Sequence, residues 1–534
     1  MKGGGNRHPA YRRLPDSAKS PGFLTFERSE IDQSIPDRFE KIVRLYPRRT
    51  ALRSGDVAFD YASLNGKANR LARALQDCGT KDDAPIALLT DQGPSNVTAV
   101  LAVLKSGRFF LPLDSQQPMA RNRLIIEESG AQTLITDGAN LHKARTVSGN
   151  MRQLVDVEDP GKGFSSDDLQ LDIDPDSIAQ IVYTSGSTGI PKGVVHTHRQ
   201  VLHNVMRHTN TFLIHSGDRQ SLLYPPHAYA GTREIYNALL NGACLCHFPV
   251  MENPSGLSDW VQDEGITIYC SVTTVFRFLL DRLATATTFP HLRVIKLGGE
   301  STFRKDIENL RNKIESDCYV HCGLGISETG LSSHYFFDRH HEIPGEKVPL
   351  GYPSLDVDLK ILDEERQPIR QGSVGEIAVK SRYIASGYWR RDDLTRAKFL
   401  RDSTDREART YLTGDLGCIH PDGALEYRGR MDQQVKIRGN RVDLSEIEAR
   451  LVATPSVKEA AVLVREDARG QSHLVAYWTP VAEQVLGHRK IREVLLKFLP
   501  VHAVPLIFVK MERMPMTPTG KINKRALPDP QQLD

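Results

Sequence analysis

Short runs of apolar, often β-branched residues alternate along most of the chain with stretches whose apolar positions recur at helical spacing. Residues 64–79 repeat apolar positions every three or four residues and close on a glycine, which predicts a helix. Residues 84–90 predict a buried strand, residues 97–107 the next helix and residues 131–137 the next strand. This alternation predicts an α/β domain with a mostly parallel sheet and helices on both faces.

The C-terminal part of the chain has a different pattern. A helix start at Asp443 and Ser445 precedes two strand-like segments and a further amphipathic stretch, which together predict a small α+β domain. The N-terminus is rich in glycine, proline and charge, which predicts a flexible extension. The expected organisation is therefore an extension over residues 1–24, a large α/β domain over residues 25–431 and a small α+β domain over residues 432–534.

Composition excludes several classes of protein. The 534 residues carry a net charge of +3, which does not favour a nucleic-acid partner, and they contain no apolar run long enough to span a membrane. The seven cysteines are irregularly spaced and form no C-x-x-C pair, so neither a zinc ribbon nor a disulfide framework is indicated. With no signal-peptide pattern at the N-terminus, we expect a cytoplasmic protein without a membrane partner.

The most informative segment joins two β-branched runs through a loop rich in glycine and hydroxyl residues. Glycines let backbone N–H groups turn toward an anion, hydroxyls add donors, and a nearby lysine adds positive charge. Lys192 is followed by Gly193, so the spacing is not that of a P-loop. A surface turn explains such a dense loop poorly, and we interpret it as a polyphosphate site made by Thr184, Ser185, Gly186, Ser187, Thr188, Gly189 and Lys192.

The string YTSGSTGIPKG at residues 183–193 resembles the signature of the adenylate-forming superfamily, which includes adenylation domains of nonribosomal peptide synthetases, acyl-CoA ligases and luciferases. Seven further motifs resemble those of the family in order, along most of the chain. The strings LPLD and QVKIRG favour the nonribosomal-peptide branch. The further motifs are FDYASLNGKANRLARAL (59–75), LKSGRFFLPLDSQQP (104–118), GLGISETG (323–330), GEIAVKSRYIASGYW (375–389), YLTGDL (411–416), GRMDQQVKIRGNRVDLSEIE (429–448) and TPTGKINKRAL (517–527).

The resemblance implies a site for ATP and Mg²⁺. Adenylation needs ATP held with its α-phosphorus exposed, a carboxylate placed for in-line attack, and neutralisation of the charge that develops. Glu328 resembles the acidic residue that holds Mg²⁺, Asp415 resembles the carboxylate that binds the ribose hydroxyls, and Arg430 reinforces the ribose end. The other nucleotide contacts implied are Gly299, Glu300, Gly323, Leu324, Gly325 and Ser327.

The resemblance also implies two half-reactions, served by a mobile C-terminal domain. Lys521 resembles the catalytic lysine of adenylation, Asp432 matches the hinge, and rotation would bring Lys436 toward the acyl-adenylate for attack by a pantetheine thiol. The chain ends soon after Lys521, so we expect the acceptor to be a separate holo carrier protein, or CoA. Ser301 lies in LGGES, which mimics a carrier signature, but its position inside the large domain does not suit modification.

The acyl pocket departs from the pattern of amino-acid-activating domains. An aspartate there pairs with the substrate α-amino group, whereas Tyr229, or Ala228 in the other possible register, takes its place here. A buried ammonium without a counter-charge is costly, so we expect a carboxylic acid without the α-amine. Glu234 would serve an amine only in a shifted pose. The expected pocket comprises His227, Tyr229, Ala230, Arg233, Cys270, Lys296, Gly298, Leu331 and Ser332.

Three details of this pocket lead to further expectations. Gly298 and Gly323 are expected to make room in its walls. Arg233 and Lys296 either meet a second anionic or polar group on the acid or turn away into salt bridges. Leu324 replaces the tyrosine that stacks on adenine in the family, so base stacking is expected to be weaker.

Three functions therefore stay open at this point. The first is a ligase that loads a carboxylic acid onto a separate carrier protein. The second is an acyl-CoA ligase of the same fold, or an enzyme that activates an unusual amino acid. The third is a scaffold that binds nucleotide without chemistry, for which the altered GLGISE string is the only support.

Overall fold

A computed structural model describes residues 13–77, 83–149, 151–159, 163–184, 191–402, 405–431, 434–454, 456–466, 471–481, 487–516 and 522–530. The chain divides into two compact units. The large unit consists of Met1–Ser115, Ser129–Tyr183 and Gly193–Met431, and the small unit consists of Gln116–Glu128, Thr184–Lys192 and Asp432–Asp534. Each unit has its own hydrophobic core.

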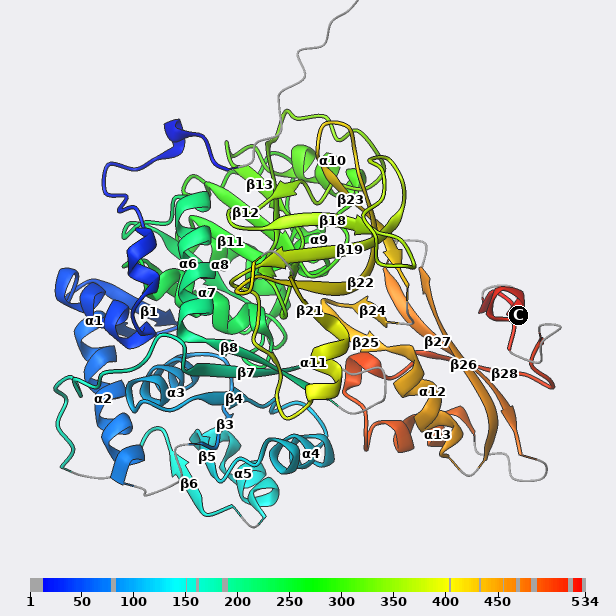
Figure 1. The fold of residues 1–534 in the computed structure, drawn as a ribbon, viewed down its shortest axis with the longest axis horizontal. Helices are drawn as coiled ribbons and strands as arrows, with labels where there is room; N and C mark the ends of the chain where they lie inside the picture. Colours follow the sequence, from blue (N-terminus) through cyan, green and yellow to red (C-terminus); the bar gives the residue numbers. More distant parts are fainter. Residues whose placement is uncertain are drawn as a thin grey trace, which may run out of the picture. The chain divides into compact units, whose positions relative to one another are not determined.

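One sheet of the large unit is built from the alternating elements at the start of the chain (Figure 1). Its strand order is β20-β8-β7-β4-β3-β5-β6, and β3 pairs in parallel with both β4 and β5. The strands are β3 Ile86–Leu89, β4 Phe110–Pro112, β5 Thr133–Thr136, β6 Gln153–Asp156, β7 Ile178–Thr184, β8 Lys192–Thr197 and β20 Gly387–Tyr388. The accompanying helices are α1 Ile35–Leu45, α2 Tyr61–Asp77, α3 Pro94–Lys105 and α5 Leu141–Ser148, whereas α4 Met119–Ser129 belongs to the small unit except for its last residue.

The strand and helix predictions in this region are confirmed to within a few residues, and the predicted α/β fold class is confirmed with them. The apolar run of β3 is buried at every position, as expected of a strand covered on both faces. The helix predicted over residues 97–107 begins earlier, at Pro94, because proline is well placed in the first turn, where its missing N–H is not needed.

A second sheet of the large unit carries the strands that surround the expected acyl pocket. Its order is β17-β16-β13-β12-β11-β9-β10-β1-β2, and β9, β10, β11, β12 and β13 run in parallel. The strands are β1 Thr50–Ser54, β2 Val57–Asp60, β9 Arg219–Leu222, β10 Cys244–His247, β11 Ile268–Val272, β12 Val294–Gly298, β13 Tyr319–Cys322, β16 Ser333–Asp338 and β17 Tyr352–Pro353. The helices are α6 His198–Phe212, α7 Tyr229–Leu239, α8 Leu257–Asp263, α9 Thr273–Arg282 and α10 Arg304–Lys313.

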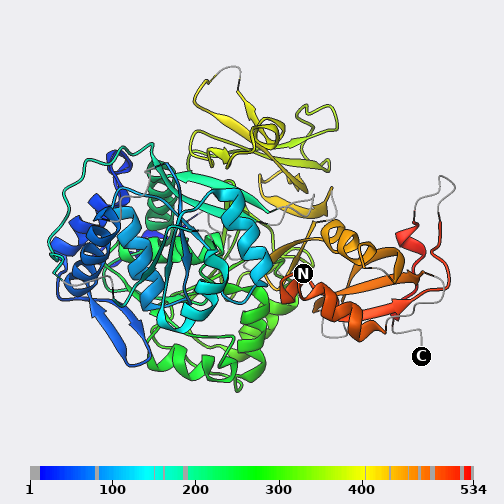
Figure 2. The ribbon, with the colours of Figure 1, turned by 90° about the horizontal axis from the view of Figure 1, so that it is seen from below.

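The third sheet of the large unit is antiparallel and forms a layer of its own, seen in yellow in Figure 2. Strand β22 lies between β19 and β21 and also pairs with β23. Its strands are β18 Asp358–Leu362, β19 Gly375–Ser381, β21 Phe399–Arg401, β22 Arg409–Ile419 and β23 Leu425–Arg430, with α11 Asp392–Lys398 beside them. A short hairpin of β14 Gly325–Ile326 and β15 Gly330–Leu331 completes this unit.

The small unit is an α+β structure. Strands β26 and β27 form a long antiparallel pair to which β28 adds in parallel, and apolar residues of α12 and α13 share a core with them. The N-cap of α12 is Asp443, whose carboxylate accepts from the backbone N–H of Ser445, as the sequence predicts. The elements are β24 Gln434–Ile437, β25 Asn440–Asp443, α12 Leu444–Val452, β26 Val457–Glu466, β27 Ser472–Pro480, α13 His488–Leu495 and β28 Ile507–Lys510.

The predicted N-terminal extension is too long. Leu14 is fully buried in the core of the large unit, and its backbone N–H donates to the carbonyl of Thr211 at 3.1 Å. An apolar side chain held in this way is part of the fold, because its removal from water stabilises the contact. The error arose because a single leucine among polar residues gives no periodic signal.

Candidate active site

The base of the phosphate loop is formed by the ends of two strands. Strand β7 ends at Thr184 and β8 begins at Lys192, and the Thr184 hydroxyl donates to the Lys192 carbonyl at 3.5 Å. Lys192 is buried. The predicted phosphate ligands Ser185, Gly186, Ser187, Thr188 and Gly189 lie outside the described residues.

Glu328, the predicted Mg²⁺ ligand, lies fully buried in the large unit. Its Oε1 accepts a hydrogen bond from the Tyr388 hydroxyl at 3.0 Å. Nearby, His196 Nε2 lies 2.7 Å from the Ser327 carbonyl, and burial lowers the pKa of His196 to about 4, so the ring is neutral and Nε2 donates. A buried carboxylate held by a tyrosine hydroxyl is a suitable oxygen ligand for Mg²⁺.

No cluster of three or more His, Cys, Asp or Glu side chains able to hold a metal ion occurs in the part of the chain that the structure describes. Magnesium is usually held by one or two carboxylates while substrate phosphates and water complete its coordination. Glu328 is therefore compatible with a metal that arrives with a nucleotide.

Asp415 and Arg430, predicted to bind ribose, are cross-strand partners. They face each other in the register of β22 and β23, and Arg430 Nη1 lies 2.5 Å from Asp415 Oδ1. The preceding Gly414 has φ of 72°, and its N–H donates to Glu376 Oε1 at 2.7 Å, which fixes the turn of the strand before Asp415. The two side chains, fifteen positions apart, thus form one charged site with little exposure to solvent.

The remaining predicted nucleotide residues lie in two turns. Gly299 has φ of 84°, and the Glu300 carboxylate accepts from the Thr274 backbone N–H at 2.9 Å and from its hydroxyl at 2.7 Å. Leu324 is buried in an apolar cluster, and its N–H donates to the Ser333 hydroxyl at 2.9 Å. The hairpin of β14 and β15 carries Gly325 and leads into Ser327.

The expected acyl pocket is centred on the first turn of α7. Tyr229 opens the helix, is 9% exposed, and stacks on the His196 ring with centroids 4.8 Å apart. His227 Nδ1 lies 3.5 Å from Asp114 Oδ2. Ala230 is partly buried beside them. In the register that places Tyr229 at the expected aspartate position, this chain holds a phenol packed against a neutral imidazole.

Arg233, Glu234 and Lys296 form a buried charge cluster. Glu234 Oε1 accepts from Arg233 Nη2 at 2.5 Å and from Lys296 Nζ at 2.9 Å, while Oε2 accepts from Gln220 Nε2 at 2.7 Å. Burial alone would raise the pKa of Glu234, but Lys296 and Arg233 outweigh it and lower this pKa to about 2. Glu234 is fully buried and ionised.

This geometry bears on two questions that the sequence left open. Arg233 and Lys296 turn into a salt bridge with Glu234, as one of the two expectations had it. Both oxygens of Glu234 accept hydrogen bonds from side chains of the protein, which argues against the hypothesis that Glu234 serves a substrate amine in a shifted pose.

The two pocket glycines have different reasons to be glycine. A Cβ atom added at Gly298 would meet no atom within 4 Å, so this glycine borders open space, as expected. A Cβ added at Gly323 would lie 2.2 Å from the Ser333 carbonyl oxygen, so the expectation that Gly323 makes room in the pocket is wrong. Its hydrogen atom is needed because another strand passes close to its backbone. Cys270, Leu331 and Ser332 are buried in the same region.

Several buried polar side chains near this cluster were not singled out from the sequence. They are grouped around the ring of Phe212. Lys296 Nζ lies 5.2 Å from the centroid of this ring, and the ring centroids of His208 and His321 lie 5.6 and 4.7 Å from it. His321 Nε2 in turn lies 3.2 Å from His334 Nδ1. Arg207, on α6, is 3% exposed. The only available signal was a run of polar residues on the apolar face of residues 198–212, outside every motif.

The residues predicted for the second half-reaction belong to the small unit. Lys436 is exposed on β24, opposite Arg441 in the hairpin with β25. The predicted catalytic Lys521 and the predicted hinge Asp432 lie outside the described residues.

Among the described residues, no helix is long and apolar enough to cross a membrane.

Comparison with known proteins gives the family. The family model described as AMP-binding enzyme matches residues 39–389, and the model described as AMP-binding enzyme C-terminal domain matches residues 446–521. The chain belongs to the AMP-binding enzymes. These are adenylate-forming ligases, so the resemblance inferred from the motifs is confirmed.

This AMP-binding enzyme is similar to modules of peptide synthetases. It is 34% identical over 511 residues to tyrocidine synthase 2 of Brevibacillus parabrevis, a match that covers 95% of the chain and 14% of that relative. The chain thus spans a small part of the length of such relatives.

Solved structures share its fold. An o-succinylbenzoate CoA synthetase from Bacillus subtilis matches with a TM-score of 0.79 at 22% identity, covering 92% of this chain and 98% of that chain. Holo-PA1221, described as a protein containing adenylation and PCP domains, matches with a TM-score of 0.78 at 26% identity, covering 93% of this chain and 84% of that chain.

Proposed function

We propose that this enzyme activates a carboxylic acid without a free α-amino group. The acid carboxylate attacks the α-phosphorus of ATP, forming acyl-adenylate and releasing pyrophosphate. The acyl group then passes to the phosphopantetheine thiol of a separate carrier protein, and AMP leaves.

The observation that carries the substrate assignment is the charge state around Tyr229. This residue is neutral and packs on neutral His196, and Glu234 is saturated by Arg233, Lys296 and Gln220. An ammonium placed here would lose its hydration without gaining a carboxylate partner, which costs several kcal/mol. An acid with hydrogen or a neutral group in place of the amine avoids this cost.

The nucleotide would be held at both ends. Thr184 and Lys192, with the loop between them, would bind the β- and γ-phosphates, and Asp415 would accept hydrogen bonds from the ribose hydroxyls while Arg430 holds its carboxylate in place. Glu328 would hold Mg²⁺, which when bound neutralises phosphate charge. Lys521 would stabilise the charge that develops during adenylation.

The carrier-protein acceptor is supported by the kind of proteins that this chain is similar to. Tyrocidine synthase 2 and holo-PA1221 are peptide-synthetase proteins, and the latter is described with adenylation and PCP domains. In this proposal Lys436, exposed on its hairpin, would serve the thioester step.

The test is pyrophosphate release with ATP and Mg²⁺ across α-amino, α-hydroxy, α-keto, aryl, dicarboxylic and fatty acids. We expect activity only with acids that lack the α-amine. Lys521→Ala should abolish adenylate formation and largely spare thioester formation from preformed acyl-adenylate. Offering holo carrier protein and CoA in competition then distinguishes the two acceptors. Robust release with α-amino acids alone would contradict the substrate assignment.

A further inference from the structure

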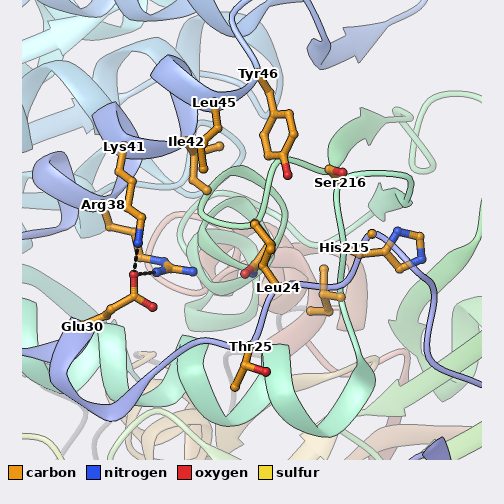
Figure 3. Close-up of a pocket in the computed structure, with 13 residues that line it drawn as sticks. Leu24, Thr25, Glu30, Arg38, Lys41, Ile42, Leu45, Tyr46, His215 and Ser216 are labelled. Carbon is orange, nitrogen blue, oxygen red and sulfur yellow. Dashed lines mark hydrogen bonds and ion pairs between the residues drawn. The ribbon is translucent and has the colours of Figure 1, made fainter.

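Arg38 and Arg207 are buried arginines of the large unit that differ in how their charge is balanced. Arg38 lines a small pocket near the N-terminus and forms an ion pair with Glu30 at 2.8 Å; Figure 3 shows Arg38 and Lys41 both directed at that carboxylate. Arg207 is equally buried, at 3% exposure against 4% for Arg38. Among the described residues, Arg207 forms no ion pair.

The guanidinium of Arg207 lies beside residues that are expected to line the acyl pocket. Its Nη2 donates to Asn204 Oδ1 at 3.1 Å, and the same oxygen accepts from the backbone N–H of Leu331 at 3.3 Å. A Cβ atom added at Gly330 would lie 3.2 Å from Arg207 Nη2. Nε of Arg207 is buried without a hydrogen-bond partner. Arg207 therefore touches the strand β15, which carries the pocket residue Leu331.

Among the described residues, the carboxylate that acts on Arg207 is that of Asp356, whose charge raises the pKa of Arg207 but which forms no ion pair with it. Asp356 is already bound by Arg28 at 2.6 Å and by His203 at 2.9 Å. Glu234 is bound by Arg233 and Lys296.

The surrounding histidines add no charge either. Burial lowers the pKa of His334 to about 3 and those of His208 and His321 well below the usual range, so all three are neutral at physiological pH. Positive charge is thus in excess around the pocket. A buried, unpaired guanidinium is costly, and burial lowers the pKa of Arg207 only to about 10, so it remains protonated at neutral pH.

We propose that Arg207 recognises a second anionic group on the acid that the enzyme activates, so that the substrate class is an acid with an additional carboxylate. This inference rests on the proposed function, because it concerns the same pocket. One carboxylate of the substrate attacks the α-phosphorus of ATP, and the other forms an ion pair with Arg207 and neutralises its charge. The planar guanidinium suits a carboxylate because it can donate two parallel hydrogen bonds to it.

The experiment compares matched acids in ATP–pyrophosphate exchange: succinate with butyrate, adipate with hexanoate, and phthalate with benzoate. We expect the wild-type enzyme to prefer one diacid over its monoacid partner by about 10²-fold or more in kcat/KM, because a site built for a polar group rejects the analogue that lacks it. Arg207→Gln should remove this preference, mainly by raising KM for the diacid. Arg207→Lys should restore part of it.

Arg38→Gln is the matched control, because it removes an equally buried arginine outside the acyl pocket. It should reduce thermal stability and leave the ratio of diacid to monoacid activity unchanged. If Arg207→Gln fails to fold, the ratio of diacid to monoacid activity in the wild type and in Arg207→Lys still tests whether Arg207 binds a second carboxylate. Equal use of diacids and monoacids by the wild type, or equal loss of both in Arg207→Gln, overturns the role of Arg207 and leaves adenylation intact. Absence of exchange with every acid overturns the proposed function as well.

Discussion

Lys296 Nζ donates to Glu234 Oε1 at 2.9 Å, and neither residue is more than 5% exposed. Lys296 comes from β12 and Glu234 from the second turn of α7, so the bond ties a central strand to the helix that begins at the pocket. Arg233 shares the same carboxylate. Of the two expectations for Arg233 and Lys296, the salt bridge is the one that the structure shows.

Removing the charge of Glu234 should destabilise the large unit strongly. Glu234→Gln leaves Arg233 and Lys296 buried without their counter-charge, and we expect a loss of about 3–5 kcal/mol in the free energy of unfolding. The double variant with Lys296→Met should recover part of that loss. Urea unfolding of the single and double variants measures both effects.

Glu264→Gln serves as the control for Glu234, because its two partners Arg53 and Arg219 are 45% and 31% exposed. It should cost about 1 kcal/mol or less. A cost for Glu234→Gln no larger than this would show that the buried cluster contributes little.

The two pocket glycines should respond differently to alanine. Gly323→Ala forces a Cβ toward the Ser333 carbonyl, and overpacking of this kind typically costs about 1–3 kcal/mol. Gly298→Ala meets open space, so stability should change little, while kcat/KM for bulky acids should fall by about 10-fold or more. Thermal unfolding and pyrophosphate exchange of both variants test this; the reverse pattern would mean that Gly298, not Gly323, is needed for packing.

Loss of Asp415 should weaken ATP binding. Asp415→Asn removes the carboxylate charge that Arg430 holds at 2.5 Å, and we expect KM for ATP to rise by about 10–100-fold with a smaller change in KM for the acid. The control is Arg428→Gln, since Arg428 lies on the same strand as Arg430 and is 47% exposed in its pair with Glu426. Exchange rates measured at varied ATP concentration give the answer. An unchanged KM for ATP would mean that Asp415 does not bind the nucleotide.

Stability should fall as the pH drops below 6.5. Burial lowers the pKa of His196 to about 4 and that of His334 to about 3, so in this range the unfolded chain binds protons that the folded chain does not. Each such histidine contributes a slope of about 1.4 kcal/mol per pH unit, with stability lost on acidification from the unfolded pKa down to the folded one. His334→Gln should therefore flatten the dependence measured by urea unfolding at pH 7, 6 and 5. An identical slope in the variant would mean that His334 is charged in the fold.

Much of this protein follows from its sequence. The alternation of apolar runs and helical spacing predicted the α/β fold, because burial on both faces of a sheet requires it, and β3 and α2 lie where expected. The ordered motifs indicated the family and brought attention to Asp415, Arg430 and Glu328. Such motifs are readable because a turn or a ligand needs particular residue types at adjacent positions.

The charge balance of the pocket could be read only from the tertiary structure. Arg233 and Glu234 are neighbours in sequence, but Lys296 reaches the same carboxylate from another element, and only the folded structure shows that both oxygens already accept from protein side chains. Arg207 lies in no motif, and among the described residues it forms no ion pair, while Asp356 is bound by Arg28 from a distant part of the chain. Gly298 and Gly323 look alike in sequence and differ in what passes beside them. Sequence determines which chemical groups are present, whereas pairing and free space depend on distances between segments that only the folded chain brings together.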